Sequence, residues 1–270
     1  MIAIQVPAST SNLGPGFDAL GLALNLHLTV GFEPPPDHWG SFLFQGEGAD
    51  SLRDASEDNL IFRTMRFAAE REGVDLRPVR VYVKNEIPLA RGLGSSGAAI
   101  IAGLSLFEAI TDSSLGPDKL LSYATEIEGH GDNVTAALLG SFVVSCVSND
   151  GTVMCERLSW PEELRAIAVI PDFKVRTEEA RAVVPDLIPR KDAVSNIQRS
   201  SLMVAAVAGR RFDVMREAMR DCLHQPYRAP LVPGLAEVLE LADGRLADTP
   251  GFVGLALSGS GPTVLALATG

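Results

Sequence analysis

A glycine-rich stretch at residues 88–97, Pro-Leu-Ala-Arg-Gly-Leu-Gly-Ser-Ser-Gly, has the residue types and spacing of an anion-binding turn. Before it, residues 79–84 alternate valine with polar side chains, which predicts a strand. After it, residues 100–110 are apolar on most sides, which predicts a buried helix. A glycine-rich turn that opens a buried helix presents unpaired backbone N–H groups at the positive helix end, where phosphate is the usual ligand. The alternative is a plain tight connection, because small residues also let a helix and a sheet pack closely.

The stretch lacks the marks of the best-known phosphate motifs. A Walker loop requires Gly-Lys followed by Ser or Thr, and this loop contains no lysine. A Rossmann turn requires Gly-x-Gly-x-x-Gly near the start of a βαβ unit. The chain also contains neither the His-Arg-Asp nor the Asp-Phe-Gly sequence of protein kinases. The sequence therefore indicates a phosphate site of another kind.

Two more clusters carry side chains suited to binding or catalysis. Asn12 and Asp18 lie within residues 8–18, which we expect to form a long polar loop in which such side chains often bond their own backbone. Residues 126–133, Glu-Ile-Glu-Gly-His-Gly-Asp-Asn, combine carboxylates with a histidine and an asparagine. A kinase needs a carboxylate for magnesium and a polar group that positions the attacking hydroxyl. The alternatives are a solvated helix face for Glu126 and Glu128 and a helix cap for Asp132, and we adopt the cap.

Arginines suited to anionic ligands occur later in the chain. Thr177 and Arg181 are one helical turn apart and share a face. Arg228 follows in His-Gln-Pro-Tyr-Arg. The planar fork of arginine pairs with both oxygens of a carboxylate. Considered singly, Arg181 and Arg228 are each better interpreted as an ordinary surface arginine.

Together these segments resemble the motifs of the GHMP small-molecule kinases, in the family order and over nearly the whole chain. The resemblance rests on Pro-x-x-x-x-Asn-Leu-Gly-Pro-Gly-Phe-Asp at residues 7–18, the central glycine loop, residues 126–133, Thr-x-x-Ala-Arg, Pro-Tyr-Arg and the second glycine loop at residues 258–262. The sequence departs from the family at Gly97, where alanine is usual. It also stops after its last expected strand, where relatives continue through a further helix and strand. We expect the shorter C-terminal domain to weaken packing or expose a sheet edge.

The resemblance implies ATP-dependent phosphorylation of the side-chain hydroxyl of L-homoserine, giving O-phospho-L-homoserine and ADP on the path to threonine. An amino-acid substrate is favoured by Arg228, Asn12 and Asp18, since the aspartate can meet an ammonium group. One rival is a GHMP kinase for another small alcohol, such as mevalonate or shikimate. The other is a catalytically silent binding protein of the same fold, against which the metal carboxylate argues.

The resemblance also implies a role for individual residues. ATP would be bound by Asn59, Pro88, Arg91, Gly92, Leu93, Gly94, Ser95, Ser96 and Gly97. Mg²⁺ would be held by Ser96 and Glu126, with Glu128 as the alternative carboxylate. The substrate would be bound by Asn12, Asp18, His130, Arg181, Arg228 and Gly259. The catalytic residues would be Asn133, Thr177 and Arg181. Because an asparagine cannot accept a proton at useful pH, catalysis through Asn133 would rest on alignment and charge neutralisation.

The elements that must position these residues are mixed helices and strands. Strands are expected at residues 2–6, 20–32, 42–44, 79–83, 142–146, 166–170, 252–257 and 263–267. Helices are expected at residues 59–72 (capped by Ser56), 100–110 and 117–128, and then from Thr177, Asp192, Arg211 and Pro233. We predict an α+β fold with a boundary near Pro161. The resemblance implies a ribosomal-S5-domain-2-like domain at residues 1–160 and a ferredoxin-like GHMP domain at residues 161–270.

Composition limits the remaining function classes. The net charge of −11 argues against a nucleic-acid partner, which would favour a basic face. The sequence contains no run of about 18 apolar residues, so we expect no membrane span. The N-terminus lacks the basic region of a signal peptide. The 3 cysteines lack metal-ligand spacing, so we expect a reduced, cytoplasmic setting. The sequence does not determine the oligomeric state, and a homodimer is the assembly to test.

Overall fold

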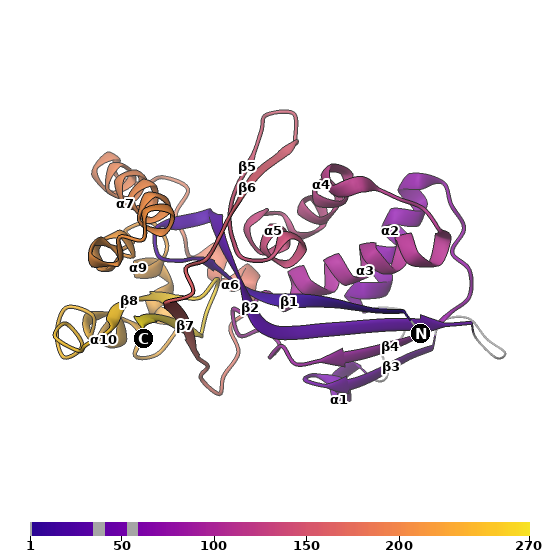
Figure 1. The fold of residues 1–270 in the computed structure, drawn as a ribbon, viewed down its shortest axis with the longest axis horizontal. Coiled ribbons are helices and arrows are strands. Elements are labelled where there is room, and N and C mark those ends of the chain that lie inside the picture. Colours follow the sequence, from indigo (N-terminus) through magenta and orange to yellow (C-terminus); the bar gives the residue numbers. More distant parts are fainter. Residues whose placement is uncertain (1, 35–40, 53–58) are drawn as a thin grey trace.

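The computed structural model describes residues 2–34, 41–52 and 59–270, so the expected cap Ser56 lies outside the described residues. The molecule is elongated, with one β-sheet towards each end (Figure 1). Both sheets carry helices, in agreement with the predicted α+β class. Within the described residues, no helix combines the length and apolar character that a bilayer crossing requires.

The first sheet is built around one long strand, β2 (Gly16–Glu33). Its order is β3-β4-β2-β5-β6, with β1 paired to β2. The other strands are β1 (Ile2–Asn12), β3 (Ser41–Gly46), β4 (Arg80–Asn85), β5 (Phe142–Val147) and β6 (Val153–Leu158). All pairs are antiparallel except β3 with β4. The alternating leucines of residues 20–32 correctly predict β2, but β6 was not predicted.

The long loop expected at residues 8–18 is instead a β-hairpin. β1 continues to Asn12 and β2 starts at Gly16, with register shifts after Pro7 and after Ser11. The prediction was wrong because residues 9–11 are polar yet almost completely buried, so the hydrophobic alternation that marks a strand is lost. Their hydroxyl groups find partners in the candidate site described below.

Helices α2 (Leu60–Glu72), α3 (Ser95–Thr111), α4 (Gly116–Glu128) and α5 (Asp132–Leu139) lie on one face of this sheet (Figure 1). A short helix, α1 (Ala49–Leu52), follows β3. α3 lies at the centre of the largest core cluster, as its uniformly apolar sequence predicts. Helices α2 and α3 pack closely at Gly103, where a Cβ would lie 2.7 Å from the Ile61 carbonyl oxygen. The helix that follows the glycine loop is therefore closely packed against α2.

Asn59 is the N-cap of α2, and its Oδ1 accepts a hydrogen bond from the Phe62 N–H at 2.9 Å. Asn59→Ala is expected to lower the free energy of unfolding by about 1 kcal/mol, because a buried N–H loses its acceptor. Asn59→Asp keeps a capping oxygen and serves as the matched control. Urea titrations of both variants measure the change; equal stability of the alanine variant and the parent would contradict the capping role.

The second sheet has the order β7-β9-β8, all antiparallel, from β7 (Leu164–Val169), β8 (Phe252–Leu257) and β9 (Val264–Thr269). The strand predicted at residues 252–257 has the observed bounds, and those at 166–170 and 263–267 overlap β7 and β9. The accompanying helices are α6 (Thr177–Ala182), α7 (Arg190–Gly209), α8 (Met215–Ala218), α9 (Gln225–Arg228) and α10 (Leu235–Glu240). Short 3₁₀ turns lie at η1 (Phe212–Val214) and η2 (Ala229–Leu231).

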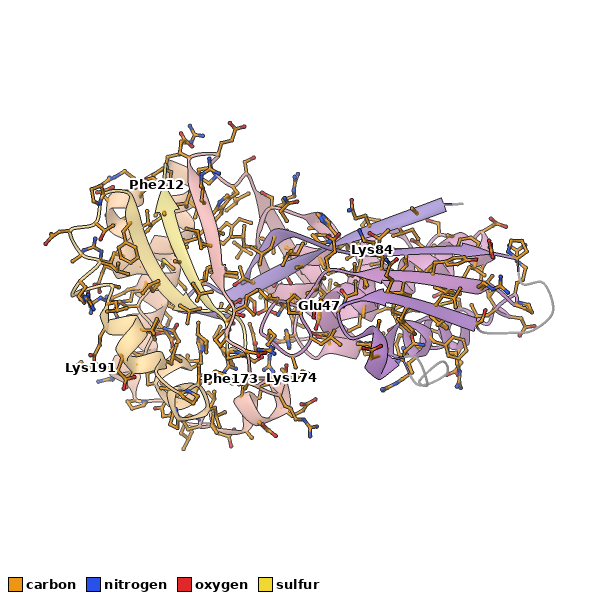
Figure 2. The ribbon with its side chains drawn as sticks, turned by 90° about the horizontal axis from the view of Figure 1, so that it is seen from below. Glu47, Lys84, Phe173, Lys174, Lys191 and Phe212 are labelled. Carbon is orange, nitrogen blue, oxygen red and sulfur yellow. The ribbon has the colours of Figure 1, made fainter. Side chains whose placement is uncertain are left out.

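The two sheets share part of their core. One cluster contains Leu20 and Phe142 from the first sheet together with Leu164 and Leu265 from the second. The segment before α6, marked by Phe173 and Lys174 in Figure 2, passes between the sheets. There the Val175 N–H donates to the Ala90 carbonyl oxygen in the glycine loop at 3.2 Å. The glycine loop therefore lies where the two halves of the chain are in contact.

Candidate active site

A pocket in this contact region is lined by most of the predicted site residues. The predicted residues that line it are Asn12, Asp18, Arg91, Gly92, Leu93, Gly94, Ser95, Ser96, His130, Asn133, Thr177, Arg181, Arg228 and Gly259. They come from the β1–β2 hairpin, the glycine loop, the turn into α5, the start of α6, α9 and the second glycine loop. Segments more than 200 residues apart in sequence are thus brought to one place, as the hydrogen bond from Asn12 Nδ2 to the Gly259 carbonyl oxygen illustrates.

The glycine loop opens α3 in a conformation that depends on its glycines. Gly92 (φ +74°) and Gly94 (φ +66°) have left-handed backbone. A Cβ at Gly92 would overlap the Ser258 carbonyl oxygen, and one at Gly94 would overlap Ser9 Oγ. Gly94 is the N-cap of α3 and has no side chain to cap the helix. The first N–H groups of α3 therefore lie uncapped by a side chain at the helix end that lines the pocket. This arrangement suits phosphate oxygens.

Neighbouring strands hold the loop in place through hydrogen bonds. The Ser9 N–H donates to the Leu93 carbonyl oxygen at 3.1 Å, and Ser258 Oγ donates to the Gly92 carbonyl oxygen at 2.6 Å. Arg91 donates to the Pro171 carbonyl oxygen and pairs with Asp172. Residues 9–11 can be buried although polar because their hydroxyl groups also have partners: Asn133 for Ser9 and Ser11, and Ser258 for Thr10.

Three predicted nucleotide residues do not line the pocket: Asn59, Pro88 and Gly97. Asn59 caps α2, as described above. Gly97 lies in the first turn of α3, where an added Cβ would be 3.3 Å from the Asn133 Cβ. Its small size therefore allows close packing of α3 against α5. Alanine, the usual residue of the family at this position, would place its Cβ in this tight contact with Asn133.

Of the two candidate metal carboxylates, the structure places the preferred one, Glu126, outside the pocket and the alternative, Glu128, inside it. Glu126 is exposed and pairs with Arg71 on the outside of α4. Glu128, the stated alternative, points into the pocket, and its Oε1 accepts a hydrogen bond from Ser96 Oγ at 2.6 Å. Residues two positions apart in a helix point in directions about 200° apart, so only one of Glu126 and Glu128 can face α3.

The Glu128 carboxylate has the features of a cation ligand. Burial raises the pKa of Glu128 above its ordinary value, against the lowering effect of the Ser96 hydrogen bond. The nearest basic group in its ion-pair contacts is His130, whose Nε2 lies 3.9 Å away. A buried carboxylate beside a hydroxyl at a helix start provides the oxygen ligands that Mg²⁺ prefers. The residues present therefore fit a magnesium ion.

His130, Asp132 and Asn133 form one buried network. Asp132 Oδ1 lies 2.6 Å from His130 Nδ1 and accepts from the Asn133 N–H at 2.7 Å. Gly131, and not Asp132, is the N-cap of α5, so the predicted cap is displaced by one residue. Asp132 is 1% exposed and lines the pocket, a position that the cap interpretation missed.

This network gives folding a defined pH dependence. Burial alone would lower the pKa of His130, but the hydrogen bond and charge of Asp132 outweigh it and raise that pKa. The stabilisation from charged His130 is therefore complete below the unfolded pKa of about 6.5 and is lost as the pH rises through the folded value. We expect the parent to lose more stability than His130→Gln between about pH 6 and about pH 9. Urea midpoints for both proteins across that range are the measurement; parallel curves would contradict the raised pKa.

Asn133 is held at both ends of its amide group. Oδ1 accepts from Ser9 Oγ at 2.8 Å, and Nδ2 donates to Ser11 Oγ at 3.0 Å and to Asp132 Oδ1 at 3.3 Å. Ser11, which was not predicted, lines the pocket through this contact. The orientation of the amide is thus determined by its neighbours, as alignment of a ligand requires.

An ion pair lies on the other side of the pocket. Arg181 forms two hydrogen bonds to Asp18, at 2.6 and 3.0 Å, and its guanidinium lies 5.6 Å from the Phe17 ring centre. Asp18 also has a carboxylate oxygen within 4.8 Å of ligand atoms of His130 and Asp132, a grouping that could hold a cation. This corner of the pocket therefore brings together two carboxylates, Asp18 and Asp132, with Arg181 paired to the first.

Arg228 provides a positively charged corner and is only 2% exposed. Nε donates to the Ala180 carbonyl oxygen at 3.0 Å and Nη1 to the Gly259 carbonyl oxygen at 2.9 Å. Burial, followed by the nearby charge of Arg181, lowers the pKa of Arg228 to about 10, so the group is still charged at neutral pH. In the described part of the chain Arg228 has no carboxylate ion-pair partner.

The second glycine loop closes the pocket. The Gly259 carbonyl oxygen accepts from Asn12 Nδ2 at 3.2 Å as well as from Arg228. Ser260 Oγ lies 3.5 Å from Thr177 Oγ1 at the start of α6. Ala90 and Ser260 also line the pocket and were not predicted, although Ser260 lies within the recognised Ser-Gly-Ser-Gly-Pro sequence. The loop thus joins the hydroxyl of Thr177 to the charged side chains.

A glycine-rich helix start of the kind that suits phosphate, a buried carboxylate beside it and charged side chains in the same pocket are the features expected of a small-molecule phosphotransferase. The family model for the N-terminal domain of GHMP kinases matches residues 59–141, and the model for their C-terminal domain matches residues 203–270. The chain belongs to the GHMP kinase family.

Individual relatives narrow the comparison. The chain is 42% identical to homoserine kinase of Solibacter usitatus, covering 97% of this chain and 83% of the relative. It is also 42% identical to homoserine kinase of Carboxydothermus hydrogenoformans, covering 99% of this chain and 85% of the relative. The crystal structure of homoserine kinase from Cytophaga hutchinsonii is 28% identical, with a TM-score of 0.81 over 99% of this chain and 85% of that one.

Proposed function

We propose that this protein transfers the γ-phosphate of ATP to the side-chain hydroxyl of L-homoserine, producing O-phospho-L-homoserine and ADP for threonine biosynthesis. The observation that carries the proposal is the pocket itself, in which a phosphate-type helix start shares the lining with a carboxylate corner, Asp18 and Asp132, and an arginine corner, Arg228. The identity to homoserine kinases over nearly the whole chain supports the same substrate.

The charged corners match the two ionic groups of an α-amino acid. Asp18 receives the ammonium group, with His130 and Asn12 lining that side. Arg228 receives the carboxylate, because its hydrogen-bond partners are neutral and no carboxylate in the described residues forms an ion pair with it. The carbonyl of Gly259 keeps Asn12 and Arg228 in register. The substrate is thus oriented by charge at one end, with its hydroxyl directed to the glycine loop.

The nucleotide is proposed to bind with its phosphates at residues 91–96 and the start of α3. Ser96 and Glu128 would hold Mg²⁺, which neutralises developing charge on the transferred phosphoryl group when bound. Pro88 and Gly97 contribute by shaping the loop and its packing. Thr177 and Arg181 are proposed to contact the transferred phosphoryl group and the hydroxyl, which their position in the pocket lining supports.

Catalysis is proposed to depend on alignment. The homoserine hydroxyl oxygen attacks the γ-phosphorus, the bond from that phosphorus to the ADP oxygen breaks, and the proton passes late to an oxygen of the transferred phosphate. Asn133 orients the hydroxyl through an amide that Ser9 and Ser11 fix in place. Phosphoryl transfer requires mainly positioning and electrostatic stabilisation, so the absence of a proton acceptor at residue 133 is compatible with turnover.

A substrate panel tests the proposal. Purified protein is incubated with ATP, magnesium and L-homoserine, L-serine, mevalonate or shikimate, and ADP release is measured. We expect release with homoserine well above that with the other alcohols. Release with another alcohol alone would contradict the homoserine assignment but keep a kinase. ATP binding by folded protein without any release would instead support a silent binding protein.

The organisation of the chain is part of the proposal. A boundary near Pro161 separates an N-terminal domain, residues 1–160, from a C-terminal domain, residues 161–270. A cytoplasmic location agrees with the free state of all three cysteines. A homodimer is testable by light scattering at several protein concentrations.

A further inference from the structure

A buried histidine outside the predicted site, His224, contacts Arg228 and the turn of the β1–β2 hairpin. It is 0% exposed and immediately precedes α9. Its Nε2 lies 2.8 Å from the Gly14 carbonyl oxygen, and its Nδ1 lies 3.2 Å from Arg228 Nη1. The ring stacks on Phe17 with ring centres 5.3 Å apart. His224 therefore connects the turn of the β1–β2 hairpin to the arginine of α9.

These two contacts determine the tautomer. A carbonyl oxygen can only accept a hydrogen bond, so Nε2 must carry the hydrogen. A guanidinium can only donate, so Nδ1 must be unprotonated. Only the neutral Nε2–H ring satisfies both neighbours, whereas an imidazolium would place an N–H against the Arg228 N–H. Burial lowers the pKa of His224, which agrees with a neutral ring.

The backbone around His224 is held by a carboxylate. Asp221 Oδ2 accepts from the N–H groups of His224 at 2.9 Å and Gln225 at 2.6 Å, and Oδ1 accepts from Asn196 Nδ2 at 2.7 Å. Asn196 Nδ2 also lies 3.3 Å from the Pro15 carbonyl oxygen. The hairpin turn, α7 and the start of α9 are thus linked, and the imidazole has a defined position between them.

We infer that His224 is a positioning residue for the carboxylate end of the amino-acid substrate, because its neutral ring sets the separation between Arg228 and the β1–β2 hairpin. The hairpin carries Asn12 and Asp18 at the ammonium end. The inference rests on the proposed function and deepens it. An arginine at a fixed distance from an aspartate selects a ligand whose carboxylate and ammonium have the spacing of an α-amino acid.

A comparison of two acceptors isolates this role. L-homoserine carries the carboxylate, whereas 2-aminobutane-1,4-diol keeps the ammonium and hydroxyl groups and lacks it. His224→Gln and His224→Phe both remove the acceptor at Nδ1; glutamine keeps a polar group at the end of the side chain, whereas phenylalanine keeps the aromatic ring. His224→Asn is the rescue variant, since its Oδ1 stands close to the place of Nδ1. Arg228→Met provides the reference for lost carboxylate recognition.

The quantity measured is the ratio of kcat/KM for L-homoserine to kcat/KM for the diol. We expect this ratio to fall by about tenfold or more in His224→Gln and His224→Phe, and by less in His224→Asn. The KM for ATP should change little. In the Arg228→Met background, His224→Gln should have no further effect on the ratio. Thermal unfolding identifies which variants are folded, and either acceptor-deleting variant is sufficient for the test.

Equal losses with both acceptors would show that His224 only supports the fold, and the inference would be wrong. Turnover of L-homoserine by the parent in the same assay separates that outcome from failure of the proposed function. If the parent phosphorylates neither acceptor, the proposed function is wrong and the inference falls with it.

Discussion

Replacing Glu128 by glutamine is expected to lower kcat by roughly 10²–10³-fold, the loss typical when one charge-stabilising group is removed from an active site. The Glu128 carboxylate lies 2.6 Å from Ser96 Oγ at the start of α3, inside the pocket. The amide of glutamine keeps the shape and one oxygen but loses the negative charge that holds a divalent cation. The concentration of Mg²⁺ needed for half-maximal activity should rise at the same time.

Glu126→Gln is the matched control, because it makes the same chemical change two residues away on the same helix. Glu126 is exposed and paired with Arg71, and exposed ion pairs contribute little to stability. Its kcat and Mg²⁺ dependence should stay within about twofold of the parent. Magnesium titrations of both variants give the answer. A loss of activity in Glu126→Gln with a normal Glu128→Gln would contradict the site.

The choice between the two glutamates was available in the sequence. In α4, Leu121, Ala124 and Thr125 are buried, and Glu128 follows them at spacings of seven, four and three residues. This is the helical spacing of one face, so Glu128 continues the buried stripe. The family pattern led instead to Glu126. Helical phase therefore favours Glu128 as the residue that faces the pocket, where the family pattern favoured Glu126.

The regular elements were predictable for a simple reason. The alternation in residues 20–32 and the apolar character of residues 100–110 are local signals, and β2 and α3 follow them. The hairpin strands at residues 9–11 carry no such signal. Their burial depends on partners 84 to 248 residues away, such as Leu93, Asn133 and Ser258. Local patterns cannot reveal polar residues that are buried because a distant segment satisfies them.

The same limit applies to the charged residues. The spacing of Thr177 and Arg181 predicted one shared helix face, but the sequence does not show that Arg181 pairs with Asp18. Nor does it show that His224 faces Arg228 and Gly14. A histidine four residues before an arginine is compatible with many folds. Its tautomer follows only from the two atoms that its ring nitrogens contact.

Gly94→Ala is expected to lower kcat/KM for ATP by about 100-fold, the effect of displacing reacting groups by about 1 Å. Gly94 has φ +66°, and an added Cβ would overlap Ser9 Oγ and lie 2.9 Å from Asn133 Oδ1. Relief of this overlap must move the glycine loop away from β1 or displace the Asn133 amide. Either movement changes the helix start that is proposed to bind phosphate. Steady-state kinetics with varied ATP, together with an ADP-binding titration, measure the loss.

Gly73→Ala separates backbone strain from this steric effect. Gly73 has nearly the same φ, +65°, at the end of α2, but nothing lies within 4 Å of an added Cβ. Alanine there should reduce stability by about 1 kcal/mol, since left-handed backbone disfavours a Cβ, and leave kcat/KM for ATP unchanged. Because both variants carry the same intrinsic strain, the difference between their kinetics reports the contact of the loop with Ser9 and Asn133. Equal kinetics in the two variants would mean that this contact does not position the nucleotide.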